Sequence, residues 1–593
     1  MSKRVQHLRG TTSLHATFTG RSGEITVDTD KKTAVVHDGA TAGGFALARS
    51  DLLAATGGAS LIGIADVGGY FASLQVEAAL QEMASATGQF ATEINVLRYI
   101  PPALWPAIVA GTSTTELTTY AQTAVDFLTG IGGGVLFFPA GLFLLGNVKA
   151  RNKVKVRGVR GGTVLKVPAG VDKQVFYNEN QAAGTPIDYF GLEDLILDGN
   201  VSNAPRAVAA SAVAVNCVNR FYARNCIFQN SSGYGLAFQS QDNTSLPGQQ
   251  KRIYLEGCEF NDNGIGSTTP GDTYDGLDIK DCERLVAIDC HANRNYDRGF
   301  NIRGQFVSMF GCTSEGNGFG GTTGLTGGFE MVANVNTTRM TTLRMVSCES
   351  YNNSGPGFNF SNGTGTPAAN GWVRVQMSAC TARGNGGNGL ETLGTSNKVE
   401  MIVDGLISVE NAGYGVDLAQ TTLSCKISGT IKGNGLSGVR TAMTKLRLSD
   451  CDIQGNTGYG VEETATATRT ILDGATIVAG NTSGQFLWNA NGRRHVGRCV
   501  VDYDAGVDDA IASAATITLP EGGDFFAITG TTSITSITAG RRGRVVTLQF
   551  AGALTVTDGS NLALAGNFVT TSADTITLAC DGTNWFEISR SVN

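Results

Sequence analysis

Four carboxylates close together near the middle of the sequence carry its clearest chemistry. They are Asp275, Asp278, Asp297 and Glu330. Hydrolysis of a glycosidic bond needs one carboxylic acid to protonate the leaving oxygen and a second carboxylate to activate water or to attack the sugar. Crowding of carboxylates raises the pKa of one member, as a general acid near neutral pH requires. We expect Asp297 to be the general acid. Asp275 or Asp278 would be the general base, with Glu330 as a reserve carboxylate.

Cationic, aromatic and amide side chains accompany these carboxylates. Arg298, Arg303 and Lys280 would hold an acidic sugar or serve as ion-pair partners of the acids. Aromatic rings present an apolar face with a polar edge, so the tyrosines are candidates for stacking on sugar rings. Glu391 and Asp417 form a second acidic pair further along the chain. The substrate-binding candidates are Arg298, Arg303, Lys280, Tyr274, Tyr296, Asn301, Glu391 and Asp417.

A repeated register must position these residues. Between Cys226 and Gln485, a small or apolar residue is followed five positions later by Asn and then, usually after four more, by Gly. In ten such units the Asn position holds Asn nine times, and the position five residues before it holds Cys seven times. This regularity favours repeats that stack into a solenoid. The Asn positions are Ser231, Asn263, Asn295, Asn317, Asn353, Asn385, Asn411, Asn434, Asn456 and Asn481.

The residues around each Gly predict the fold class. Apolar and polar residues alternate after the Gly, which is typical of a short strand with one buried face. The spacing between units falls to 22 residues, too short for paired helices but sufficient for three short strands. We therefore predict an all-β chain with a right-handed parallel β-helix, whose turns stack at roughly 4.8 Å. Asn and Gly would occupy the bends because both tolerate a left-handed backbone.

The second residue after each Gly forms a polar column. If the first and third residues after the Gly point inward, the second points outward. Strands favour Thr and Val over Asp and Asn, so the column is interpreted as a functional stripe, although outward positions are often polar anyway. The column consists of Ala237, Asp278, Asn301, Glu330, Asn359, Glu391, Asp417, Arg440 and Glu462.

Two long connections single out one part of this stripe. The Asn-to-Gly segments Asn263–Gly276 and Asn317–Gly328 are expanded and lie on either side of the Asn295 turn. Loops on a rigid scaffold often carry binding sites, so these two would wall a groove centred on Asn295.

The strings that hold the carboxylates resemble a known hydrolase pattern. Residues 273–278 and 295–301 are similar to the Asn-Thr-Asp and Asp-Asp motifs of polygalacturonase-type glycoside hydrolases, with Asp275 and Asp297 as the matching carboxylates. Tyr and Arg replace two motif residues, and no Gly-His-Gly follows.

Longer stretches resemble phage proteins. Gly132–Gly141 with the downstream Asn/Gly turns resembles the pectate-lyase superfamily of β-helix proteins over roughly residues 100–495, whereas Arg9–Gly44 and Val76–Met83 resemble modules of bacteriophage tail fibres and tailspikes. That resemblance implies a virion protein made in the host cytoplasm and acting outside the cell. Its N-terminal module would attach to a phage tail or baseplate protein, and its homotrimeric β-helix would bind and degrade bacterial capsule or O-antigen.

The patterns predict four regions, and the resemblance to tailspikes implies their roles. Residues 1–50 would be an N-terminal β module for virion attachment, and residues 51–99 a linker with an amphipathic helix that could form a trimeric coil. Residues 100–499 would be the β-helix with the catalytic and receptor-binding surface. Residues 500–593, rich in alternating Thr, would be an antiparallel β domain for trimerisation or glycan binding.

Composition excludes several other classes. The net charge is −7 with no sustained Lys/Arg block, which disfavours nucleic acid as a partner. No apolar run of about 18 residues occurs, so membrane insertion is not expected. Most of the 12 Cys sit in one repeated column, which predicts free buried thiols. The five His are scattered, and we expect neither a metal nor a cofactor.

Three functions remain open from the sequence. The first is an endo-acting polysaccharide depolymerase that works by hydrolysis. The second is a lyase acting by β-elimination on a uronic acid, with or without calcium, in which Arg298 or Lys280 would be the base. The third is a non-catalytic receptor-binding fibre whose acidic stripe only binds glycan.

Overall fold

The computed structural model describes most of the chain. The amphipathic helix expected in the linker, at residues 70–87, lies outside the described residues. Those are residues 6–47, 92–170, 173–179, 185–202, 211–238, 250–265, 274–320, 326–333, 341–361, 372–393, 398–418, 424–464, 467, 469–488, 493–496, 500–501, 510–520, 524–540 and 542–593.

The N-terminal module is a small sheet with one short helix. Four strands lie in the order β1-β2-β3-β4, and β2 and β3 pair antiparallel as their alternation predicts. Alternation along β2 and β3 buries one sheet face and leaves the other open. The elements are β1 (Arg9–Gly10), α1 (Thr12–His15), β2 (Ile25–Asp28), β3 (Thr33–Val36) and β4 (Phe45–Ala46).

A helix covers the first turn of the solenoid. α4 (Thr118–Gly130) packs against β6 (Gly134–Phe137), β8 (Val148–Lys149) and β9 (Val154–Arg157). Its fully or almost fully buried face consists of Ala121, Ala124, Val125 and Leu128. A capping helix is expected on a solenoid because an open end would expose the apolar interior.

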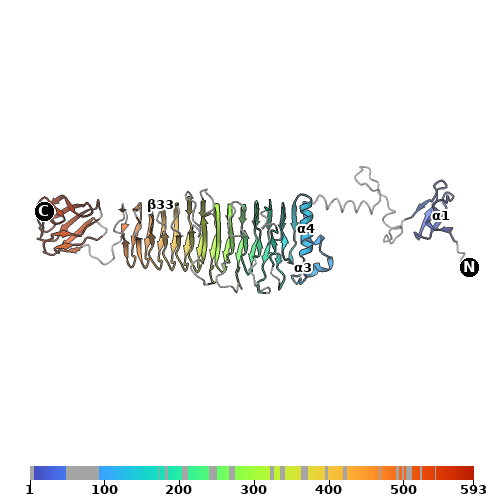
Figure 1. The fold of residues 1–593 in the computed structure, drawn as a ribbon, viewed down its shortest axis with the longest axis horizontal. Coiled ribbons are helices and arrows are strands. Elements are labelled where there is room, and N and C mark those ends of the chain that lie inside the picture. Colours follow the sequence, from blue (N-terminus) through green and yellow to red (C-terminus); the bar gives the residue numbers. More distant parts are fainter. Residues whose placement is uncertain are drawn as a thin grey trace. The chain divides into compact units, whose positions relative to one another are not determined.

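Each turn of the solenoid contributes one strand to each of three parallel series. Two successive turns are formed by β15 (Arg220–Arg224), β16 (Ile227–Gln229), β17 (Leu236–Phe238), β18 (Gln250–Glu256), β19 (Glu259–Asn261) and β20 (Leu277–Ile288). Every strand of one turn pairs in parallel with its counterpart on the next. This pairing runs from the first turns to β41 (Val500–Val501), so the predicted parallel β-helix is confirmed (Figure 1).

The third series carries the candidate site. Beyond β17 and β20 it includes β22 (Arg298–Phe310), β24 (Gly327–Ala333), β27 (Phe358–Ser361), β30 (Leu390–Leu393), β32 (Val416–Leu418), β34 (Val439–Thr441) and β36 (Tyr459–Glu463). β20 and β22 each continue through a bend into the first strand of the next turn. The backbone that carries the site is therefore part of a long strand.

The repeated Asn residues form an internal ladder. Each side chain is at most 5% exposed, and in all of them except the last, Asn481, Nδ2 donates to Oδ1 of the Asn on the next turn at 2.8–3.0 Å. The same Oδ1 also accepts the backbone N–H of the Asn on the previous turn. The ladder therefore satisfies buried backbone groups at every bend, which a solenoid needs.

The explanation of Asn by a left-handed backbone is wrong. Positive φ, between 52° and 63°, occurs one residue earlier, so the Asn side chain is selected for its hydrogen bonds instead. The residues with positive φ are Asn230, Asp262, Arg294, Gly316, Asn352, Gly384, Glu410, Gly433, Gly455 and Gly480.

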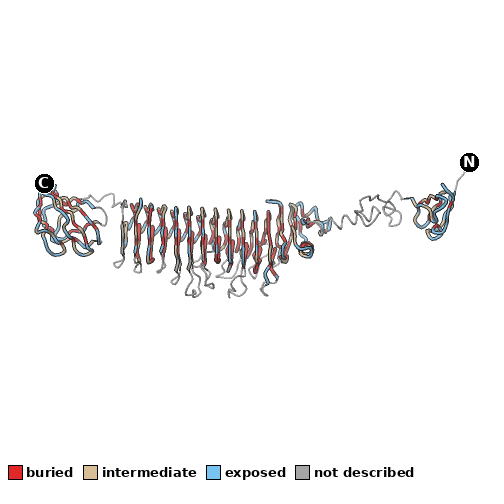
Figure 2. Tube along the Cα trace, turned by 90° about the horizontal axis from the view of Figure 1, so that it is seen from above, coloured by how far each residue is buried: buried red, intermediate tan, exposed pale blue. Residues whose placement is uncertain are grey.

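Apolar and thiol side chains fill the interior. The Phe300, Phe329 and Phe358 rings stack on successive turns with centroids 4.8 and 5.1 Å apart. The Cys column is free of disulfides and buried, as predicted, among the described residues. Figure 2 shows that buried residues recur on every turn of the solenoid.

The C-terminal domain contains a sheet with both parallel and antiparallel strand pairs, packed on an apolar core that includes Trp585. β46 (Val545–Phe550) pairs antiparallel with β50 (Thr575–Cys580), which pairs antiparallel with β51 (Trp585–Ser591). However, β44 (Phe525–Thr529) pairs in parallel with β46. The expected purely antiparallel arrangement is therefore wrong. Trp585 is fully buried in a cluster of aliphatic and aromatic side chains that supports this sheet. No helix in the described part of the chain is long and apolar enough to cross a membrane.

Candidate functional site

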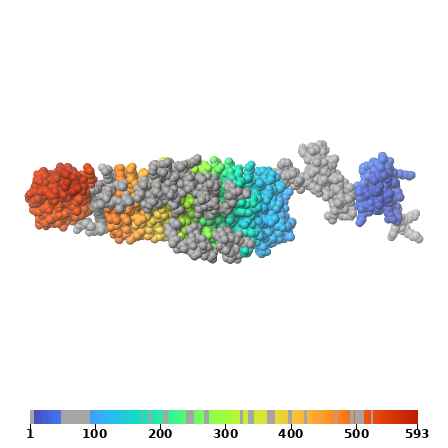
Figure 3. Space-filling view, viewed as in Figure 1, coloured from blue at the N-terminus to red at the C-terminus, as the bar shows by residue number. Residues whose placement is uncertain are grey.

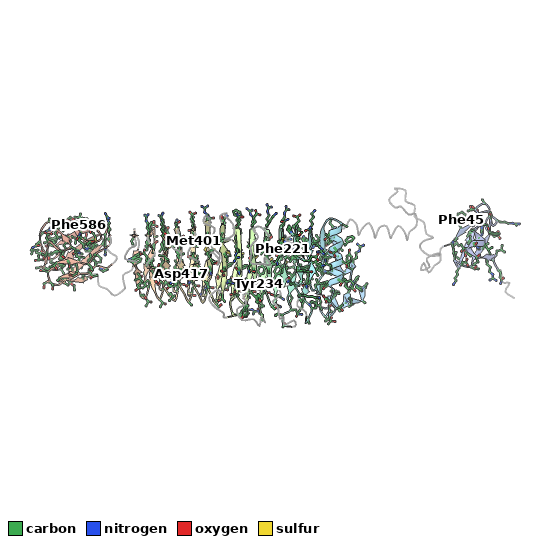
Figure 4. All side chains as sticks on the ribbon, in the orientation of Figure 1. Phe45, Phe221, Tyr234, Met401, Asp417 and Phe586 are labelled. Atoms are coloured by element: carbon green, nitrogen blue, oxygen red, sulfur yellow. The ribbon has the colours of Figure 1, made fainter. Side chains whose placement is uncertain are left out.

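The polar column of the third strand series is continuous. Strand pairing aligns its members directly, one on each turn, so the register predicted from the Gly positions is confirmed. In order they are Ala237, Asp278, Asn301, Glu330, Asn359, Glu391, Asp417, Arg440 and Glu462. Figure 4 labels Asp417 in this column, and Figure 3 shows successive turns following one another along the surface in sequence order.

The column points away from the apolar interior, as expected, but most of its acids are buried. Asp278 is 0% exposed, Asp417 4% and Glu330 8%. Strand alternation places these side chains opposite the apolar ladder, but surrounding atoms exclude water from them. A buried charge is tolerated only with a partner, so each acid in the column must be paired or protonated.

Arg298 is the centre of the buried charges. Its side chain is 6% exposed, and its Nη1 lies 2.7 Å from Oδ2 of Asp297 and 3.5 Å from Oδ1 of Asp275. Its Nε forms an ion pair with Oε2 of Glu330. The structure thus brings together Asp275, Asp297 and Glu330, three of the four predicted catalytic carboxylates, around a guanidinium that was predicted to bind substrate.

Asp275 is the most enclosed of these acids. Its Oδ1 accepts the backbone N–H of Arg298 at 3.0 Å, and its Oδ2 accepts Nδ2 of Asn301 at 2.9 Å. The side chain is 0% exposed. It therefore supports β22 from the preceding turn, and Asn301, a predicted substrate ligand, takes part in the same support.

The two motif carboxylates are offset by one position between successive turns. Leu277 pairs with Phe300, so Asp275 is the counterpart of Arg298. The backbone N–H of Asp297 donates to the carbonyl of Tyr274, which makes that tyrosine the counterpart of Asp297. Asp275 and Asp297 are linked because both contact Nη1 of Arg298. They do not occupy equivalent positions on two turns.

Burial shifts the titration of this cluster. Burial raises the pKa of Asp297 to about 6, against the opposing charge of Arg298 and with a further increase from Glu330. Burial also raises the pKa of Asp275 well above its usual range, despite Arg298, with added repulsion from Asp297 and Asp278. For Arg298 burial lowers the pKa, but the three carboxylates more than compensate and raise it above the usual range. Arg298 is therefore a permanent cation.

A pocket adjoins the cluster. It is lined by Arg298, Gly327, Phe329, Glu330, Pro356 and Asn359. Asn359 is 3% exposed, and its Oδ1 has no hydrogen-bond partner in the part of the chain that the structure describes. The pocket thus joins a cation, a carboxylate and an unsatisfied amide acceptor. Sequence reasoning placed Asn359 in the column but not in the site, although its alignment with Glu330 was a usable signal.

The other two predicted cations differ from each other. Nζ of Lys280 lies 3.7 Å from Oδ2 of Asp278, so these two form an ion pair away from Arg298. Arg303 pairs along the backbone with Val332, two residues beyond Glu330, which lines the pocket. Its buried Nε has no hydrogen-bond partner among the described residues. Asp278, the fourth predicted catalytic acid, belongs to the Lys280 pair.

The predicted tyrosines are packed against other aromatic rings. Tyr274 contacts Tyr234 edge to face with centroids 5.3 Å apart, and Tyr296 contacts Phe319 in the same way at 5.6 Å. Each ring thus has one edge or face occupied. The two expanded turns that were expected to wall the groove fall mainly in residues 266–273 and 321–325, which lie outside the described residues.

The second acidic pair has its own partners. Asp417 accepts two hydrogen bonds from Arg440, at 2.8 and 2.5 Å, and Arg440 lies over the Tyr414 ring. Nδ2 of Asn388 donates to Glu391 at 2.7 Å. Burial raises the pKa of Glu391 to about 7, lowered in part by Asn388 and raised further by Asp417. This pair forms a separate site two turns along the column from Glu330.

No cluster of three or more His, Cys, Asp or Glu side chains suited to a metal ion occurs in the described ranges. The expectation of a metal-free and cofactor-free protein therefore stays a prediction.

Comparison with known proteins identifies two parts of the chain. Residues 5–41 match the family model of the major tropism determinant N-terminal domain, and residues 211–405 match the right-handed β-helix region. The predicted resemblances to a phage tail-fibre module and to a right-handed parallel β-helix are thereby confirmed for these segments.

Three individual proteins are similar over part or all of the chain. The tail fibre receptor-binding protein of Bordetella phage BPP-1 is 72% identical over 53 residues, which cover 9% of this chain and 14% of that protein. Mannuronan C5-epimerase AlgE2 of Azotobacter vinelandii is 31% identical over 102 residues, 16% of this chain and 10% of the epimerase. The solved tailspike protein 3 of bacteriophage CBA120 aligns with a TM-score of 0.45 at 10% identity, over 99% of this chain and 86% of that one. The chain thus spans only a small part of the two curated relatives.

Proposed function

We propose that this protein is a bacteriophage tail protein that binds a bacterial surface polysaccharide and cleaves it by glycoside hydrolysis at the carboxylates around Arg298. One observation carries the catalytic part. Asp297 and Glu330 both bind the guanidinium of Arg298, which brings two carboxyl groups to one place, as glycoside hydrolysis by paired carboxylates requires. The same two acids differ in environment, as an acid and base pair must.

The environment of each acid suggests its role. Asp297, with a pKa of about 6, is protonated often enough near neutral pH to act as general acid. Glu330 lines the pocket and is the base or nucleophile. Asp275 is fully buried and holds Arg298 and Asn301, so it is a positioning residue in this scheme.

β-Elimination fits this site less well than hydrolysis. A lyase needs a base that can lose its proton, whereas three carboxylates keep Arg298 protonated. Lys280 is engaged with Asp278. β-Elimination on a uronate is the second candidate function. It is favoured by the similarity to an enzyme named for epimerising mannuronan, because epimerisation and β-elimination would both begin by removing a proton from the sugar.

The N-terminal module supports attachment to the virion. Ile25, Val36 and Phe45 lie side by side on three strands of its sheet, and Ile25 and Phe45 are 41% and 56% exposed. An apolar row of this kind is expected to be covered by protein in the assembled particle. We propose that the partner is a phage tail or baseplate protein and that the whole chain acts as a homotrimer in the virion.

The test is incubation with surface polysaccharide purified from the bacterium that the phage infects. Size-exclusion chromatography and mass spectrometry should show shorter chains without the ultraviolet absorbance of an unsaturated uronide. Asp297→Asn should lower the rate at least about 100-fold while binding persists, because the proton donor is lost. The matched control is Glu400→Gln, since Glu400 is 44% exposed in a surface ion pair outside the column.

Three results would decide against this proposal. Binding of the polysaccharide with no shortening would make the protein a receptor-binding fibre only. Unsaturated products would make it a lyase. Full activity of Asp297→Asn would move the reaction to another part of the column.

A further inference from the structure

The pocket beside Arg298 contains an acceptor that the protein leaves unused. Oδ1 of Asn359 is buried and has no hydrogen-bond partner among the described residues. Its neighbours in the column, on the turns before and after, are Glu330 and Glu391. Both neighbours are carboxyl groups that act mainly as acceptors, so neither satisfies an amide oxygen when ionised. A buried polar group without a partner is unfavourable, and a bound ligand that donates a hydrogen bond would remove this defect.

The charge around the pocket is already balanced or negative. Arg298 is the one cation among the pocket-lining residues, and it faces Asp275, Asp297 and Glu330. Charges interact strongly where water is excluded. A ligand carboxylate entering the pocket would meet the Glu330 carboxylate and would compete with three existing partners for Arg298. A neutral group that donates hydrogen bonds meets no such penalty.

We infer that a sugar bound over this small pocket is uncharged and directs a hydroxyl or acetamido N–H at Asn359, and that the pocket does not accept a uronate carboxylate. This inference rests on the proposed function because it names the sugar class bound at the same site. It makes Asn359 a specificity-determining residue. It also assigns Arg298 to the organisation of the carboxylates, in place of the expected binding of an acidic sugar.

Arg303 provides the competing possibility. Its guanidinium Nε is buried without a hydrogen-bond partner in the described ranges, and it lies on β22 two residues beyond Asn301. A uronate-binding site would use this cation instead of Asn359. The two readings therefore predict opposite results for substitution of these two residues.

The first experiment uses the unmodified full chain. Surface polysaccharide from the susceptible bacterium is tested before and after carbodiimide activation and borohydride reduction, which convert uronates into neutral hexoses. Binding is followed by biolayer interferometry and chain shortening by size-exclusion chromatography. We expect both to survive carboxyl reduction within about twofold. We also expect mass spectrometry of borodeuteride-labelled products to show no uronate at the new reducing end.

The second experiment uses two variants of the full chain. Asn359→Leu keeps the size of the side chain and removes the acceptor, so the KM should rise about tenfold with kcat less affected. Arg303→Gln should leave KM and kcat within about twofold. Unchanged thermal unfolding midpoints would show that both variants are folded.

The outcomes separate the inference from the proposed function. If chains are never shortened but binding survives carboxyl reduction and weakens in Asn359→Leu, hydrolysis fails and the sugar class stands. If carboxyl reduction abolishes binding, or if Arg303→Gln loses affinity while Asn359→Leu keeps it, the inference is overturned even though hydrolysis stands. Absence of binding to either preparation overturns both.

Discussion

At the scale of single residues, Arg298 organises the site. Its removal leaves Asp275, Asp297 and Glu330 buried without their common cation. We predict that Arg298→Met lowers the free energy of unfolding by about 3–5 kcal/mol, because a broken buried ion pair leaves uncompensated charge. Thermal or urea unfolding would measure the loss.

The control for this prediction is Arg374→Met. Arg374 also pairs with a carboxylate, but its side chain is 45% exposed. Exposed pairs contribute about 0–1 kcal/mol, so this variant should unfold almost like the native protein. Equal effects of the two substitutions would contradict the central role of Arg298.

The raised pKa of Asp297 predicts how stability depends on pH. In the folded protein the pKa of Asp297 is about 6, against a usual value of 3.8. The folded state therefore binds the proton of this carboxyl group more tightly than the unfolded state does. The contribution of Asp297 is therefore fully present below pH 3.8 and is lost as the pH rises through 6. In Asp297→Asn the thermal unfolding midpoint should change less with pH across that window than in the native protein. An unchanged pH dependence would refute the assignment.

At the scale of the repeated elements, the Asn ladder specifies the bends. Asn385 donates to the carbonyl of Ser350 and to Oδ1 of Asn411, and its own Oδ1 accepts from the backbone and the side chain of Asn353. Asn385→Ala leaves several buried groups unsatisfied, each of which costs about 1–3 kcal/mol. We predict a clear fall in the thermal unfolding midpoint.

The ladder prediction has an internal control. Asn293 lies on β21 (His291–Asn293), is partly exposed and is not a ladder member. Asn293→Ala should change the free energy of unfolding by no more than about 0.5 kcal/mol. A similar fall in both variants would show that the ladder bonds add nothing to ordinary Asn-to-Ala effects.

The repeats could be predicted from the sequence to different depths. Alternation after each Gly gave the strands, and the Gly spacing gave the aligned column, because both depend on local periodicity. The reason for Asn at the bends could not be read from the same pattern. Two causes would place Asn at the same regular spacing: a positive φ at the bend, or the hydrogen bonds of the Asn side chain. Only the backbone geometry distinguishes them, because it places the positive φ at the residue before each Asn, such as Asp262 and Arg294.

At the scale of the whole molecule, the N-terminal module and the rest of the chain form separate compact units, Met1–Ile94 and Asn95–Asn593. We predict that a chain beginning at Asn95 unfolds at the same temperature as the full chain and shortens polysaccharide at the same rate. It should no longer join the virion, which purification of particles with each form would show. Loss of cleavage in the truncated chain would mean that the module contributes to the active site.

The sequence by itself determined the β-helix, the buried Cys and the alignment of the polar column. Each of these follows from repeating side-chain types, and stacking of turns converts a spacing in sequence into a column in space. The tertiary structure decided that the column is buried, that Arg298 joins Asp275, Asp297 and Glu330, and that Asn359 lacks a donor. These properties depend on side-chain direction and on exclusion of water by neighbouring turns. A periodic pattern contains neither, so the candidate acids were found from the sequence while their roles required the fold.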